Sequence, residues 1–159
     1  MSLDFTLRCP KSVRDQLIWL KRQTGLSHYH TLCRWALCLS VADPRPVRLI
    51  GTEVDSAESE GELFAEGESK SFELPWYRLG QRDADILADI LRARAISEGM
   101  EPTREVLQKL ALAHIERGLA RMMARKRIRS IADLVQLAPT HEPVEISHNS
   151  AVENSDSAD

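Results

Sequence analysis

Alternation of apolar and polar residues marks the beginning of the chain. In residues 3–8, Leu3, Phe5 and Leu7 share one face and polar side chains share the other, which predicts a half-buried strand. Pro10 ends this strand and suits the first turn of a helix. A single short strand leaves its hydrogen-bonding edge bare, so we expect two copies of the chain to pair antiparallel through residues 3–8.

Two helices are predicted next. Apolar side chains recur at helical spacing over residues 11–24, and Gly25 can take the left-handed conformation that commonly ends a helix. Ser27 is then the expected N-cap of a second helix over residues 28–41. That helix is apolar nearly all round, so protein should cover it on both sides.

Short strands and further helices are predicted in the rest of the chain. Residues 46–50 and 70–74 have the pattern of strands that could pair. Helices are predicted over residues 82–97, 103–127 and 130–137. The side chains expected to face inward from the first of these are Ile86, Leu87, Ile90 and Leu91.

Composition divides the chain into a folded part and two acidic segments. We expect one compact domain over residues 1–138, with a strand-helix-helix unit at 3–42 and a helical part at 80–138. Residues 53–69 are acidic and poor in bulky side chains, which predicts a mobile loop. Residues 139–159 are predicted to form a disordered acidic tail.

The net charge of −3 hides two basic segments. Residues 1–50 carry eight Lys and Arg against three Asp and Glu, and residues 76–132 carry twelve against seven. Segregation of this kind bears on binding partners rather than on fold. No apolar run approaches the roughly 20 residues of a membrane span, and the first residues lack a secretory pattern. We therefore expect a cytoplasmic protein that does not enter a membrane.

The order strand, proline, helix, Thr-Gly-x-Ser, helix resembles the ribbon-helix-helix family of DNA-binding proteins. Such a ribbon enters the major groove, which would direct Thr6 and Arg8 toward DNA. The beginning of the second helix, at Ser27, would suit a phosphate. The expected fold class is mainly α, with a ribbon-helix-helix-like strand-helix-helix followed by a small β pair and three further helices.

A second resemblance covers roughly residues 3–139. The runs TGLSHYHTLCRWALCLSVADP, GMEPTREVLQKLALAHIERGL and IRSIADLVQLAP are similar to the DndE family, the small subunit of the bacterial DNA sulfur-modification (phosphorothioation) system. The resemblance implies a non-catalytic subunit that works with other subunits of the complex. The spacing of Cys and His residues predicts no metal site, and we expect no cofactor. It also implies binding to duplex DNA, with a preference for nicked duplex, through surface cations.

Candidate DNA contacts come from the strand, the first helix and a cationic run near the end of the fourth helix. Five cations within residues 121–129 exceed what one helix dipole needs. The expected assembly is a homodimer or homotetramer. The predicted DNA-binding residues are Thr6, Arg8, Lys11, Arg14, Lys21, Arg22, Ser27, Arg121, Arg125, Lys126, Arg127 and Arg129.

Three alternative functions stay open. A ribbon-helix-helix transcriptional repressor would recognise a palindromic sequence, and a pure assembly scaffold would use the acidic loop to mimic DNA. A cysteine-dependent sulfur carrier would need a reactive thiol. Cys33 and Cys38 lie five apart on the second helix, and we expect both to be small buried core residues. Cys9, next to the strand end, should be more exposed.

Several histidine and tryptophan side chains also allow both a structural and a functional interpretation. His28 and His30 lie two apart at a helix start, which predicts that they point to different faces, at the surface or against phosphate. His114 falls on an apolar stripe and should be a satisfied core or interface histidine. Trp35 and Trp76 could stack on a base at a nick, but burial in the core or an interface is the expectation.

Overall fold

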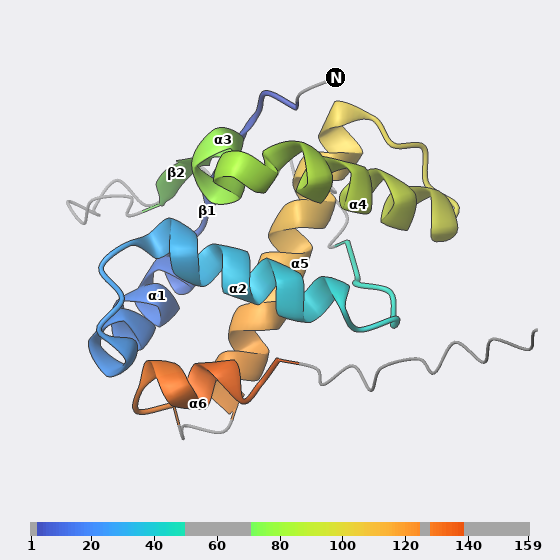
Figure 1. Ribbon diagram of the computed structural model, residues 1–159. Coiled ribbons are helices and arrows are strands. Elements are labelled where there is room, and N and C mark those ends of the chain that lie inside the picture. Colours follow the sequence, from blue (N-terminus) through green and yellow to red (C-terminus); the bar gives the residue numbers. More distant parts are fainter. Residues whose placement is uncertain (1–2, 50–70, 125–127, 139–159) are drawn as a thin grey trace, which may run out of the picture.

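The computed structural model describes residues 3–49, 71–124 and 128–138. Helices make up most of it, which confirms the mainly α fold class (Figure 1). No helix in these ranges is both long and apolar enough to cross a bilayer. The predicted acidic loop at 53–69 and the tail at 139–159 lie outside the described residues. In chain order the elements are β1 (Thr6–Cys9), α1 (Lys11–Thr24), α2 (Tyr29–Val41), β2 (Phe72–Pro75), α3 (Trp76–Gly80), the 3-10 turn η1 (Gln81–Asp83), α4 (Ala84–Ser97), α5 (Arg104–Ala124) and α6 (Ile131–Val135).

Helix α1 has the predicted bounds and the predicted end. Val13, Leu17 and Leu20 are buried along one face, which is the apolar stripe that the sequence shows. Gly25 has φ +72°, and its N–H donates to the Lys21 carbonyl at 3.0 Å. A residue with a Cβ is strained in this left-handed conformation, so glycine is the residue that ends α1 with least strain.

Helix α2 begins one residue later than predicted, and Ser27 is not its N-cap. His28 holds that position in an extended conformation (φ −116°, ψ 125°), and no side chain caps the helix. Composition favoured the serine, but the turn that joins α1 to α2 decides where the backbone becomes helical. That turn is held by Thr24, whose hydroxyl accepts from the Leu26 N–H at 3.3 Å.

Strand β1 pairs with β2 of the same chain, which corrects the predicted pairing of strands within the chain. The two strands are antiparallel, with Thr6 opposite Pro75 and Cys9 opposite Phe72. The expected pairing of residues 46–50 with residues 70–74 is therefore wrong, and one edge of the first strand is already occupied within the protomer. Alternation along a strand predicts which side chains face inward, but it does not identify the partner strand.

The inward and outward faces of β1 are as predicted. Phe5, Leu7 and Cys9 are buried, whereas Thr6 and Arg8 are exposed. Phe5 packs on Trp76 at the beginning of α3, with ring centroids 5.0 Å apart. This aromatic contact joins the start of the chain to the segment that supplies β2, which helps to select that segment as the partner strand.

Helix α5 is the central element of the core. It passes behind α2 and contacts α1, α2, α4 and β1 (Figure 1). Helix α5 approaches α2 closely at Gly118, where an added Cβ would overlap the backbone of Ala36. Helix α6 closes the described part of the chain. Its N-cap Ser130 accepts from the Asp133 N–H, the capping pair that their spacing predicts.

Helix α4 buries a different face from the one predicted. Leu87 and Leu91 are buried as expected, but Ile86 and Ile90 are 61% and 39% exposed. Ile86 and Leu91 lie about 140° apart around a helix, and a helix that packs on one side cannot bury so wide an arc. The small residues Ala88 and Ala95 complete the buried face instead. The result is an exposed apolar stripe on α4.

Candidate nucleic-acid interface

The predicted DNA contacts on β1 and α1 lie at the surface. Arg8 is 79% exposed, and its Nη2 lies 3.7 Å from the Glu73 Oε1 on β2, a loose ion pair at an exposed site. The Thr6 carbonyl accepts from Gln108 Nε2 at 3.0 Å. The remaining predicted contacts from this part of the chain are exposed Lys11, Lys21, Arg22 and Ser27, and half-buried Arg14.

The second predicted cluster, at the end of α5, is described only in part. Arg125, Lys126 and Arg127 lie outside the described residues, and Arg129 is exposed. Arg121 is turned toward the end of α2, where its Nη1 lies 3.4 Å from the Leu39 carbonyl oxygen and 3.5 Å from the Asp43 Oδ2. Its guanidinium therefore stabilises the fold even if it also contacts DNA.

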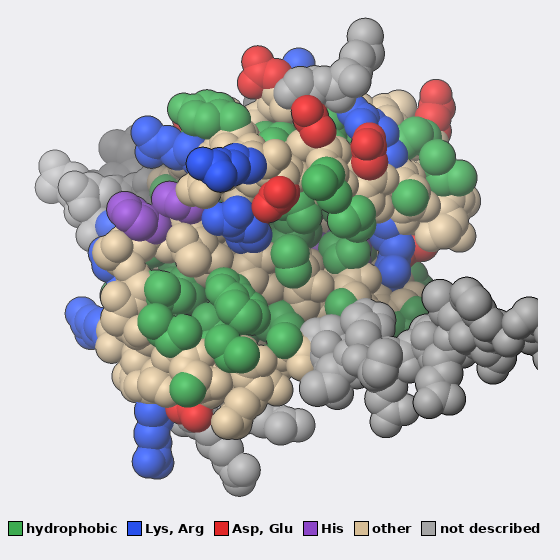
Figure 2. Space-filling model, in the orientation of Figure 1, with side chains coloured by type: hydrophobic (Ala, Val, Ile, Leu, Met, Phe, Trp, Pro, Cys, Tyr) green, Lys and Arg blue, Asp and Glu red, His purple; other side chains and the backbone are tan. Residues whose placement is uncertain are grey.

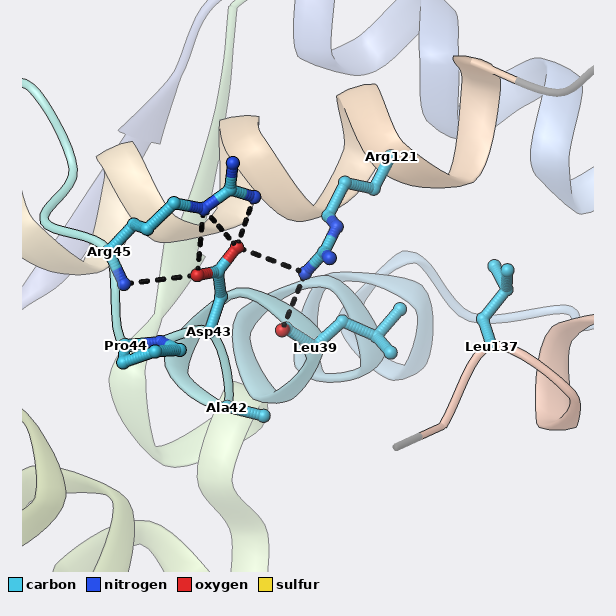
Figure 3. A pocket seen from close by; sticks show the side chains of 7 residues that line it. All are labelled: Leu39, Ala42, Asp43, Pro44, Arg45, Arg121 and Leu137. Atoms are coloured by element: carbon cyan, nitrogen blue, oxygen red, sulfur yellow. Dashed lines mark hydrogen bonds and ion pairs between the residues drawn. The ribbon is translucent and has the colours of Figure 1, made fainter. Parts of the chain in front are cut away.

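Asp43, just after α2, is the anion at the centre of this cluster. The Nε and Nη2 groups of Arg45 donate hydrogen bonds to its carboxylate at distances of 2.7–3.1 Å, and the backbone N–H of Arg45 donates to it as well. These hydrogen bonds, together with the charge of Arg45, hold the pKa of Asp43 well below its usual range. Figure 3 shows the carboxylate between Arg45 and Arg121, on the wall of a pocket of about 410 Å³.

Arg117 and Arg94 bind the carbonyl groups at the same end of α2. Arg117 donates to the Ser40 carbonyl at 2.7 Å, to the Arg45 carbonyl at 2.7 Å and to the Ser40 hydroxyl at 2.7 Å. Arg94 donates to the Asp43 and Arg45 carbonyls and pairs with Glu98. The last turn of a helix leaves carbonyl groups without intrahelical partners and carries partial negative charge, so guanidinium groups suit it. Sequence reasoning missed this cluster because its members are far apart in the chain.

His114 is buried beside this cluster. Its Nδ1 lies 2.8 Å from the Ser40 hydroxyl oxygen, and its Nε2 has no hydrogen-bond partner among the described residues. Burial, reinforced by the charges of Arg117 and Arg94, lowers the pKa of His114 to about 4. The prediction of a core histidine is confirmed, but only one of its two ring nitrogens is satisfied.

The cysteines differ from the prediction in two of three cases. Cys33 is buried as expected, but Cys38 is exposed and Cys9 is fully buried. Cys9 is the last residue of β1 and continues the inward face of Phe5 and Leu7, so strand alternation was the better guide. Burial raises the pKa of Cys9 to about 12 and also raises the pKa of Cys33, and partial desolvation raises the pKa of the exposed Cys38 thiol. All three environments disfavour the reactive thiolate.

The histidines at the beginning of α2 also differ from the prediction. The rings of His28 and His30 do not point to different faces but stack, with centroids 5.1 Å apart and planes at 19°. His28 is the extended N-cap, so the helical spacing on which the prediction rested does not apply to it. Trp76 is buried, with its Nε1 donating to the Ala84 carbonyl at 3.1 Å, and Trp35 is half-buried.

Comparison with known proteins identifies the family. No curated protein matches the chain. The sequence model of the family described as "DNA sulphur modification protein DndE" matches residues 6–130, which include every described element from β1 to α5. A match over most of the chain, in a fold of the expected class, means that the protein belongs to the DndE family of DNA sulphur modification proteins.

Proposed function

We propose that this protein is the DNA-binding accessory subunit of a DNA phosphorothioation complex, where it positions duplex or nicked DNA while other subunits carry out the chemistry. The observation that supports this most is the set of exposed cations on β1 and α1 in a member of this family. Lys and Arg that neutralise DNA phosphates release condensed counterions, which gives sequence-independent affinity. A positioning subunit needs that kind of binding.

A salt-dependent binding assay tests the proposal. Fluorescence anisotropy with labelled intact, nicked and single-stranded DNA should give a logarithm of the binding constant that falls linearly with the logarithm of salt concentration. Each neutralised phosphate contributes about 0.9 to that slope on a duplex, so six contacts lose about a thousandfold in affinity between 50 and 200 mM salt. Absence of binding, or binding that salt does not weaken, would leave the protein an assembly scaffold.

Arg8 gives the sharpest variant. If it contacts a phosphate, Arg8→Ala should weaken binding and reduce the salt slope by about 0.9 for each protomer bound. If it reads a base, the slope should stay and sequence discrimination should fall. Arg104→Ala, at an exposed arginine that begins α5, is the matched control and should change neither quantity.

We also propose that the protein forms a homo-oligomer through the exposed stripe on α4. Ile90 of this stripe lines the apolar groove between α2 and α4 together with Cys38 and Val41, and Ile86 is exposed one helical turn before it. Figure 2 shows apolar side chains gathered on this face. Contiguous apolar surface of this kind commonly marks a protein interface. Ile86→Glu with Ile90→Glu should shift the sedimentation coefficient to that of a monomer, and a wild-type monomer at micromolar concentration would contradict the proposal.

The repressor alternative has weaker support. A ribbon-helix-helix repressor builds its ribbon from strands of two chains, whereas β1 takes its partner β2 from within the protomer.

The sulfur-carrier alternative is weakened by the raised pKa of each thiol. A double variant, Cys33→Ala with Cys38→Ala, should bind DNA normally once folded. Loss of DNA modification by such a folded, DNA-binding variant would favour the carrier.

A further inference from the structure

A histidine pair and two arginines meet where α2 begins. His28 and His30 stack on each other, Arg34 follows one helical turn after His30, and Arg78 comes from α3. Figure 2 shows the two histidines side by side at the edge of the molecule, with Lys and Arg side chains next to them. We call His28, His30, Arg34 and Arg78 the histidine patch.

Gln81 holds two members of the patch in place. Its Nε2 lies 3.1 Å from the His30 Nε2, and its Oε1 accepts from the Arg34 Nη2 at 3.4 Å. An amide nitrogen can only donate, so this arrangement requires a neutral His30 with an unprotonated Nε2. Gln81 has φ +49°, the only positive φ among the described non-glycine residues. The tertiary structure thus fixes the bridging amide beside the patch.

The charges that act on His30 are all positive. Burial lowers the pKa of His30 most, and His28, Arg34 and Arg78 lower it further. Lys21, at the end of α1, lies over the ring of the neighbouring residue Tyr29, with its Nζ 5.1 Å from the ring centre. On η1, Arg82 and Asp83 follow Gln81, and Asp83 is the acidic residue of that turn. The patch therefore has an excess of positive charge that an anion would balance.

We propose that the histidine patch binds DNA backbone phosphate and that protonation of His30 strengthens this binding as the pH falls. This inference rests on the proposed DNA binding. It adds a region that contacts DNA, and it makes the proton a regulator of that binding. A phosphate beside the rings supplies the negative charge that protonated imidazoles need, so binding favours proton uptake. By linkage, proton uptake favours binding to the same extent. Because burial and the neighbouring cations lower the pKa of His30 in the free protein, we expect the change in mildly acidic solution, below the ordinary histidine pKa of about 6.5.

Protonation of His30 also changes the role of Gln81. A protonated Nε2 donates, so it can no longer accept from the amide nitrogen and instead requires the Gln81 oxygen. Turning the amide by a half-rotation supplies that oxygen and removes it from Arg34. The Arg34 guanidinium then becomes available to a phosphate, which couples the titration of one side chain to the recruitment of a second cation.

Binding of a labelled intact duplex, followed by anisotropy from about pH 8 to about pH 6 at constant ionic strength, tests the proposal. Wild-type protein should bind severalfold more tightly at the lower pH, because a phosphate that raises one imidazole pKa by about one unit gives at most a tenfold gain, which is complete only below the pKa of the free protein. The double variant His28→Gln with His30→Gln should match wild type at about pH 8 and lose most of the gain. Circular dichroism at each pH verifies that the variants are folded.

Single arginine variants separate charge from titration. Arg78→Gln should bind more weakly at every pH and keep the gain, whereas Arg104→Gln should behave as wild type does. A gain that persists in the double histidine variant, or a wild-type affinity that does not change with pH, would overturn the role of the patch and leave DNA binding itself in place. A wild-type protein that binds no DNA at any pH would instead refute the proposed function.

Discussion

Replacing Gly118 by alanine should destabilise the protein, although alanine is the better helix former. Gly118 lies in the interior of α5, where helix propensity alone predicts a gain of about 1 kcal/mol from the substitution. The contact with α2 reverses that sign. The added Cβ would lie 1.9 Å from the Ala36 carbonyl oxygen, 2.4 Å from its carbonyl carbon and 2.6 Å from its Cα.

The magnitude follows from what must move. All three atoms belong to the backbone of a buried helix, so no side-chain rotation relieves the overlap, and α2 and α5 would have to separate by about 1.5 Å to restore van der Waals contact. Overpacking in cores costs about 1–3 kcal/mol, and a clash with rigid backbone belongs at the upper end. Subtracting the propensity gain of about 1 kcal/mol, we expect a net loss of about 2 kcal/mol, a substantial part of the total stability of a typical domain.

Urea and thermal unfolding followed by circular dichroism measure this loss. A loss of about 2 kcal/mol corresponds to a fall of about 6 °C in the melting temperature of a chain of this size. Ala120→Gly, at an exposed position of the same helix, is the matched control and should cost only the propensity difference of about 1 kcal/mol. A Gly118→Ala variant as stable as wild type would refute the close approach of α2 and α5.

Three further predictions concern buried polar groups and thiols. The folded pKa of His114 is about 4, below its unfolded value, so its contribution to stability is complete above about pH 6.5 and is lost as the pH falls toward 4. That loss is about 3 kcal/mol. His114→Leu should therefore make the free energy of unfolding depend less on pH between about 6.5 and 4. An unchanged pH dependence would contradict the lowered pKa of His114. Arg117→Met should cost about 1–2 kcal/mol in urea unfolding, because the partly buried Ser40 carbonyl loses a charged donor. A neutral effect would mean that water replaces it. Maleimide should label Cys38 in the native protein and reach Cys9 and Cys33 only after unfolding, and rapid native labelling of all three would contradict their burial.

The predictions that held are those with a local cause. The bounds of α1 follow from an apolar stripe, a preceding proline and a glycine that tolerates positive φ, all within residues 10–25. The inward face of β1 follows from strand alternation, and the capping of α6 follows from the spacing of Ser130 and Asp133. The family resemblance likewise rests on contiguous runs of residues, and the family match supports it.

The predictions that failed depend on contacts between distant residues. Several segments have similar strand propensity, so the pattern within each segment does not show that β1 pairs with β2. The contact of Phe5 with Trp76 favours this pairing, but it joins residues that are far apart in the sequence. The exposure of Ile86 and Ile90 depends on which side of α4 meets α5. Hydrophobicity shows that a side chain can be buried, but the packing partner decides whether it is.

The sequence by itself determined the helical class, the main helices, the outward direction of Thr6 and Arg8, and membership of a DNA sulfur-modification family. Only the tertiary structure decided what the cations do. Arg117 and Arg121 of α5 bind the end of α2, while the histidine patch gathers side chains from α2, α3 and the turn before α2. The physical reason is that a charge has the same sequence signature whether it satisfies a buried carbonyl or faces solvent, and only its distance to other groups distinguishes the two roles.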